Sequence, residues 1–134
     1  VKSERYIFLG RQSGEIGMEK TKVRSWEIIN DMTLMKKTDK SIFRYAGATI
    51  PREMYSFFDA GSMENGERRE IRVRYDGCTY EAHLEKENLY LGRVRIFWEN
   101  KLKDVFAEVM RDETTFPWLI ISKVGDRMYE FFLR

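Results

Sequence analysis

The sequence predicts a mainly β domain of the α+β class, or an open β-barrel, with two short helices. Its 134 residues are the usual length of one domain. A hydrophobic fraction of 43%, with 9 Phe, 7 Tyr and 3 Trp, is enough to fill a core and excludes intrinsic disorder. The apolar stretches are short and often alternate with charged residues, as strands do. No stretch has the roughly 18 apolar residues that a membrane helix needs.

The N-terminal quarter predicts a strand, a loop and a helix. Residues 5–9 (RYIFL) fit a short strand, and the glycine-containing residues 10–17 fit a loop or hairpin tip. Apolar residues recur about every third position between 23 and 32, a spacing typical of an amphipathic helix, although a strand fits WEII equally well. We expect residues 1–34 to be an N-terminal extension packed on the barrel, within a single domain of residues 1–134.

The following segment predicts extended chain and then a helix. Residues 36–40 form a polar, basic break, and residues 42–50 (IFRYAGATI) are expected to be extended with an interruption at the glycine. Pro51 then opens a short helix, because a proline at the first helical position leaves no backbone hydrogen bond unmade. Polar residues 59–69 are expected to be a loop. The apolar face of the helix would be Met54, Phe57 and Phe58.

Residues 70–85 (EIRVRYDGCTYEAHLE) carry the clearest pattern in the chain. Apolar residues alternate with Arg72 and Arg74 up to the dipeptide Asp76-Gly77, which is favoured in two-residue turns because both positions accept a positive φ. The segment therefore predicts a β-hairpin. Pairing with Glu81 or Glu85 across the hairpin is one explanation for the two arginines.

The C-terminal part predicts a strand, a helix and a second hairpin. Residues 93–98 alternate as a strand does, and apolar residues between 102 and 109 are spaced as on an amphipathic helix. Residues 118–122 and 128–133 would pair across a turn at residues 124–127. The three tryptophans, Trp26, Trp98 and Trp118, are expected in the core together with the paired phenylalanines.

The chain has few groups suited to catalysis or to metal binding. One cysteine, Cys78, excludes an internal disulfide, and one histidine, His83, makes a zinc site improbable. We interpret Cys78 as a small packing residue and His83 as a residue on the rim of a strand. The glycine-containing segment GRQSGEIG does not match a phosphate-binding loop. The sequence therefore predicts no catalytic residue, no metal ligand and no cofactor.

One segment resembles half of a magnesium-dependent nuclease site. Glu99 and Lys101 follow an apolar strand, as the Glu-x-Lys half of such sites does. The nearest upstream aspartate, Asp76, is the residue expected to close the hairpin turn, which is a poor position for a metal ligand. A nuclease that uses Glu99 and Lys101 remains an alternative.

Positive charge is concentrated in one part of the chain. The whole sequence has 24 Lys and Arg against 22 Asp and Glu, a net charge of +2. Residues 36–52 alone contain five positive residues and one negative residue, a net charge of +4. Such an uneven distribution is typical of a surface that meets nucleic acid.

Three short motifs in a fixed order resemble the B-three DNA-binding pseudobarrel. They are residues 50–52 (IPR), which begin a helix, residues 76–80 (DGCTY) in a hairpin, and residues 125–126 (GD) in the last turn. The resemblance covers about residues 40–134. The plant members carry Gly-Trp before the second helix where this chain has Phe97-Trp98-Glu99. The segment GRVRIFW is more similar to bacterial relatives, the DNA-recognition domains of restriction endonucleases such as the EcoRII effector domain and the LlaJI-type amino-terminal domain.

The resemblance implies an open seven-stranded pseudobarrel that grips the DNA major groove with two arms, about residues 35–47 and 85–95. The expected function is non-catalytic, sequence-specific binding of double-stranded DNA, with cleavage in a nuclease domain or subunit of the same restriction system. Lysines would contact the backbone, and Arg and Asn side chains would come closer to the bases. Two tyrosines on the arms, Tyr45 and Tyr90, are expected to be exposed. The remaining candidates are Lys36, Lys37, Lys40, Arg44, Asn88, Arg93 and Arg95.

Other interpretations remain open from the sequence. The chain is also compatible with binding of RNA or of a modified base on a similar small barrel, and with a protein-interaction domain without affinity for nucleic acid. In that last case the basic residues would be ordinary solvated charges. The absence of a secretory signal and the single cysteine lead us to expect a cytoplasmic location.

Overall fold

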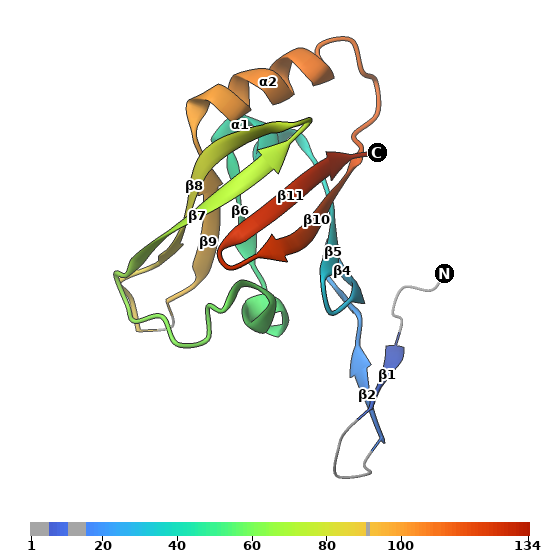
Figure 1. Ribbon diagram of the computed structural model, residues 1–134, viewed down its shortest axis with the longest axis vertical. Coiled ribbons are helices and arrows are strands. Elements are labelled where there is room, and N and C mark those ends of the chain that lie inside the picture. The colour runs from blue at the N-terminus through green and yellow to red at the C-terminus, as the bar shows by residue number, and fades with distance from the viewer. Residues whose placement is uncertain (1–5, 11–15, 91) are drawn as a thin grey trace.

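The computed structural model describes residues 6–10, 16–90 and 92–134, and of residues 6–10 and 16–20 it describes the backbone only. The described part of the chain is mainly β, with three short helices (Figure 1). The helices are α1 (Lys40–Tyr45), the 3-10 helix η1 (Arg52–Phe58) and α2 (Asn100–Met110). The strands are β1 (Tyr6–Gly10), β2 (Ile16–Lys20), β3 (Lys22–Val23), β4 (Trp26–Asn30), β5 (Thr33–Lys37), β6 (Gly47–Ile50), β7 (Arg68–Tyr75), β8 (Cys78–Lys86), β9 (Val94–Trp98), β10 (Trp118–Gly125) and β11 (Met128–Leu133).

Nine of these strands form one sheet in the order β3-β4-β5-β10-β11-β7-β8-β9-β6. All neighbours are antiparallel except β11 and β7, which are parallel. The sheet curls so that its two edges, β3–β4 and β6, face each other without pairing (Figure 1). The result is an open barrel with a seam between those edges. β1 and β2 pair with each other in a separate two-stranded sheet that projects from this body.

Aromatic side chains fill the inside of the curled sheet, and a helix closes each end. At one end Phe58 of η1 packs against Tyr129, with ring centroids 5.3 Å apart. At the other end Phe106 of α2 packs edge-on against Trp98 at 5.9 Å and against Tyr75 at 4.9 Å. The fully buried rings and aliphatic side chains therefore form one continuous core, which holds the seam strands in place.

Residues 23–32 form strands, so the predicted amphipathic helix is wrong. β4 and β5 pair as a hairpin, in which Trp26 lies opposite Lys36. The register of this hairpin shifts between Ile28 and Asn30, which marks a β-bulge. A bulge breaks the two-residue alternation of a strand, and the remaining spacing of apolar residues resembles that of a helix. Strands β3 and β4 and the start of β5, which lie within the segment expected to be an N-terminal extension, thus belong to the main sheet itself.

Residues 42–50 are only partly extended, because α1 occupies the first half of this segment. Asp39 caps the helix, and Ala46 ends it with a left-handed φ of 56°. Strand β6 begins directly afterwards at Gly47. The expected extended chain at residues 42–45 is therefore a short helix of which Ile42 is the buried member.

Both predicted hairpins and the helix after residue 100 are confirmed. Asp76 and Gly77 have φ angles of 50° and 84°, as the two-residue turn requires. The apolar face predicted for the helix after Pro51 is buried, although Pro51 stands just before the first helical residue and the helix is of the 3-10 type. The main sheet has nine strands in place of the seven expected, and it includes β3, β4 and β5.

Candidate nucleic-acid interface

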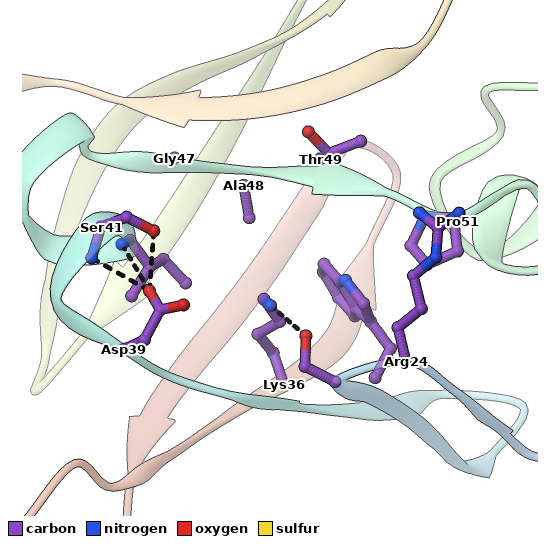
Figure 2. A pocket seen from close by; sticks show the side chains of 11 residues that line it. Arg24, Lys36, Asp39, Ser41, Gly47, Ala48, Thr49 and Pro51 are labelled. Carbon is purple, nitrogen blue, oxygen red and sulfur yellow. Dashed lines mark hydrogen bonds between the residues drawn. The ribbon is translucent and has the colours of Figure 1, made fainter.

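A groove follows the open seam of the barrel between the hairpin β4–β5 and the edge strand β6 (Figure 2). It consists of two adjoining cavities of about 240 and 350 Å³, which share Arg24, Thr49 and Pro51. The first cavity ends at Asp39 and Ser41, next to α1. The second ends at residues 92–93, in the loop between β8 and β9. The groove therefore connects the two segments that the sequence predicts as DNA-gripping arms.

Positive side chains outnumber negative ones along this groove. Arg24 stands in the turn between β3 and β4 with a left-handed φ of 55°, and its side chain extends across the groove to Pro51 (Figure 2). The lining contains four basic residues and two acidic ones. The basic residues are Arg24, Lys36, Arg52 and Arg93, and the acidic ones are Asp39 and Glu53.

Lys36 lies half-buried on the floor of the groove. Its ammonium donates a hydrogen bond to the hydroxyl of Ser25 and lies 5.5 Å from the centre of the Trp26 ring. Burial lowers the pKa of Lys36, and the nearby carboxylate of Asp39 partly opposes this effect. Lys36 is thus held by contacts within the protein, and its expected contact with the DNA backbone stays a prediction.

Asp39 is the acidic residue at the α1 end of the groove, and its Oδ1 atom accepts three local hydrogen bonds. It accepts hydrogen bonds from the Ser41 hydroxyl at 2.8 Å and from the backbone N–H groups of Ser41 and Ile42 at 3.0 and 3.2 Å. The Ser41 hydroxyl, those backbone donors and the charge of Lys36 hold the pKa of Asp39 below its ordinary value. Its negative charge is therefore spread over the helix cap.

The loop between β8 and β9 forms the other end of the groove and is tightly closed. The backbone N–H of Glu87 donates to the carbonyl of Arg93 at 2.9 Å, and the Glu87 carboxylate accepts from the backbone N–H of Arg93 at 3.2 Å. The same carboxylate accepts from Arg93 Nε at 3.1 Å and contacts Arg95 Nη2 at 2.9 Å. Two of the predicted base-reading arginines thus converge on one acidic residue.

The structure separates the predicted binding residues into three places. Lys36 and Arg93 line the groove. Arg95 pairs across the strands with Thr49, a residue that lines the groove. The others are exposed on the end of β5, on α1 or on the β8–β9 loop, with Tyr45 and Tyr90 66% and 93% exposed. These others are Lys37, Lys40, Arg44, Tyr45, Asn88 and Tyr90.

Arg24 and Arg52 line the groove but are absent from the residues proposed from the sequence. Arg52 belongs to the basic segment of residues 36–52, so its charge was a usable signal. Arg24 had none, because it follows an apolar residue in a segment that resembles a helix. Its position depends on the β3–β4 turn and on the curl of the sheet, which local sequence does not specify.

Among the side chains considered for catalysis, His83 and Glu99 contact residues of the sheet. Cys78 is exposed at the start of β8, so the interpretation as a packing residue is wrong. The ring of His83 lies 3.3 Å from the Glu85 carboxylate, and Glu99 accepts a hydrogen bond from the backbone N–H of Glu81 at 2.6 Å. Arg74 pairs with Glu130 of β11 at 2.8 Å, in place of a partner across the β7–β8 hairpin. Among the described residues, no three His, Cys, Asp or Glu side chains converge as metal ligands.

The fold is that of an open pseudobarrel, as the sequence resemblance predicts. A solved structure, the N-terminal domain of Helicobacter pylori LlaJI.R1, is similar to this chain with a TM-score of 0.51 and 16% sequence identity. The similarity covers 75% of this chain and 79% of that domain. No protein-family description and no curated protein sequence matches the chain. Within the described residues, no helix is both long and apolar enough to cross a membrane.

Proposed function

We propose that this domain binds double-stranded DNA in a sequence-specific manner, as the non-catalytic recognition module of a restriction system. The observation that carries the proposal is the seam groove, which joins the basic segment of residues 36–52 to the β8–β9 loop. A nuclease domain or subunit would then perform cleavage. The similarity in fold to the N-terminal domain of LlaJI.R1 supports this assignment.

The charges and shapes around the groove suit a duplex. Exposed lysines on β5 and α1 can neutralise phosphates, which positions the protein without reading sequence. Arginines at the other end present paired N–H donors, the groups that recognise the O6 and N7 acceptors of guanine. Phosphate contacts at one end and base readers at the other are the two elements that specific recognition needs.

A binding selection on a randomised duplex library tests the proposal. It is performed without magnesium at about 150 mM salt, where non-specific complexes are weak. We expect enrichment of one short site and strong salt dependence of the selected complex. Absence of any enriched site, together with absence of salt-sensitive retention, contradicts DNA binding. Magnesium-dependent cleavage that Glu99→Ala abolishes contradicts the non-catalytic assignment.

Two matched arginine variants locate the interface. Arg93 and Arg111 are both exposed, and each forms an ion pair with a glutamate, at 3.1 Å for Arg93 with Glu87 and 2.8 Å for Arg111 with Glu108. Only Arg93 lines the groove, because Arg111 stands at the end of α2. We expect Arg93→Ala to weaken binding to the selected site about tenfold and Arg111→Ala to leave it unchanged. Equal effects of the two variants would remove the groove from the interface.

A further inference from the structure

We propose that Glu87 is a positioning residue that lowers the affinity of the domain for arbitrary DNA and raises its discrimination between sequences. It would do so by holding Arg93 and Arg95 in a fixed pair at the end of the seam groove. This inference rests on the proposed function. It assigns a specificity-determining role to an acidic residue within a basic interface.

The contacts of Glu87 are unusually concentrated. Its carboxylate receives Nε and Nη2 of Arg93, both at 3.1 Å, and Nη2 of Arg95 at 2.9 Å. It also receives the backbone N–H of Arg93 at 3.2 Å, while its own backbone N–H bonds to the Arg93 carbonyl. The side chain and the backbone of Glu87 therefore both bind residues of the same loop. These contacts restrict the carboxylate to its position beside the two arginines.

Arg95 shows that Glu87 imposes a position on its partner. Its Nε is buried and has no hydrogen-bond partner among the described residues. A buried N–H without a partner costs free energy, so desolvation of this group disfavours the observed position of the Arg95 side chain. The contact between its Nη2 group and Glu87 at 2.9 Å offsets that loss. The contact with Glu87 thus determines the position of the Arg95 guanidinium.

Part of each guanidinium is left for a second acceptor. A guanidinium has five N–H donors, and Glu87 occupies two of those on Arg93. The Arg93 side chain is 59% exposed and that of Arg95 38%, whereas Glu87 is only 20% exposed. A DNA molecule at the groove would therefore meet arginine donors already fixed in direction. Fixed donors lose less conformational freedom when they bind a base edge.

The same carboxylate reduces the attraction for phosphates in general. Two arginines with one glutamate present a net charge of +1 in place of +2. Non-specific binding depends on the number of phosphates neutralised, so it weakens when an internal carboxylate satisfies the arginines. Hydrogen bonds to base edges depend on direction as well as charge, so the Glu87 carboxylate weakens them less than it weakens phosphate contacts. Glu87 thereby favours specific over non-specific complexes.

The variant Glu87→Gln tests this role, because glutamine keeps the size and the acceptor oxygen but removes the charge. We expect affinity for random-sequence duplex at about 150 mM salt to increase three- to tenfold, with a salt slope steeper by about one ion. The ratio of specific to non-specific affinity should fall about tenfold, as loss of one oriented bidentate contact implies. Glu108→Gln is the matched control, since it also releases an exposed arginine, Arg111; it should change neither quantity.

Each other outcome overturns the inference in a recognisable way. An equal loss of specific and non-specific affinity, with a lower melting temperature, would make Glu87 a structural residue only. Unchanged binding to both kinds of DNA would show that the two arginines do not meet DNA through this cluster. Failure of the unaltered protein to bind any duplex would overturn the proposed function itself, and this inference with it.

Discussion

The side chain of Asp39 determines where α1 begins after the end of β5. Its carboxylate satisfies the first free backbone N–H groups of the helix, those of Ser41 and Ile42. An aspartate at this position suits the positive end of the helix. The consequence extends beyond the helix, because α1 carries exposed Lys40 and Arg44 beside one end of the groove.

Asp39→Ala should therefore destabilise the protein by about 1 kcal/mol at neutral pH, the usual effect of losing an N-cap. The folded-state pKa of Asp39 is lowered, mainly by the Ser41 hydroxyl. The stabilisation is consequently complete above the ordinary pKa of 3.8 and disappears as the pH falls through the lower folded-state value. Urea unfolding at pH 7 and in the acid range measures both effects. A constant difference between the two proteins at every pH would contradict the cap.

At the scale of elements, the β8–β9 loop shows how backbone geometry prepares a binding surface. Its hydrogen bonds connect Glu87 with Arg93, Gly92 with Leu89, and Leu89 with Asn65 of the segment between η1 and β7. Leu89 and Tyr90 project from it, 63% and 93% exposed. A closed loop with large side chains exposed at its tip is well suited to contact a partner without first becoming ordered.

Gly92 is the residue on which the closure of this loop depends. A Cβ atom at this position would lie 2.3 Å from the carbonyl oxygen of Glu87 and 3.2 Å from that of Leu89. Gly92→Ala should therefore force the loop open and destabilise the protein by about 1–3 kcal/mol. Faster hydrogen exchange at the Glu87 and Arg93 amides would report the opening. Gly61→Ala is the control, because a Cβ there meets nothing within 4 Å; equal effects of both changes would contradict this account.

At the scale of the whole molecule, one aromatic cluster connects α2 to the sheet and to α1. Phe106 contacts Trp98 of β9 at 5.9 Å, Phe131 of β11 at 6.4 Å and Phe43 of α1 at 5.9 Å. The helix that closes the barrel thus also supports α1 beside the seam. Stability and the shape of the groove depend on the same packing.

Phe106→Ala should cost about 3–5 kcal/mol, because it removes a fully buried ring and leaves a cavity. Val109→Ala on the same helix is the comparison, since Val109 is 42% exposed and its loss should change stability by less than about 0.5 kcal/mol. Urea unfolding followed by tryptophan fluorescence measures both. Similar losses from the two variants would show that α2 does not pack through the face described.

Elements whose formation depends on neighbouring residues could be predicted from the sequence. The β7–β8 hairpin was predictable because Asp76-Gly77 supplies its turn and apolar residues alternate on both sides. The basic character of residues 36–52 was visible from composition. The strands β4 and β5 were not, because a bulge removes the alternation on which such a prediction relies. Likewise α1 was not predicted, because it is only six residues long and its cap is the single residue Asp39, within a polar segment.

Which charged residues share a surface depends on contacts between distant parts of the chain. Arg24 extends to Pro51, and Lys36 lies in the same groove, because the sheet curls until its edges face each other. Glu87 meets Arg95 through the pairing of β8 with β9, which sets both residues beside one loop. Strand pairing across the sheet and packing of the core act over long sequence separations. Local periodicity and composition carry no information about them, so the candidate interface appears only when the barrel is complete.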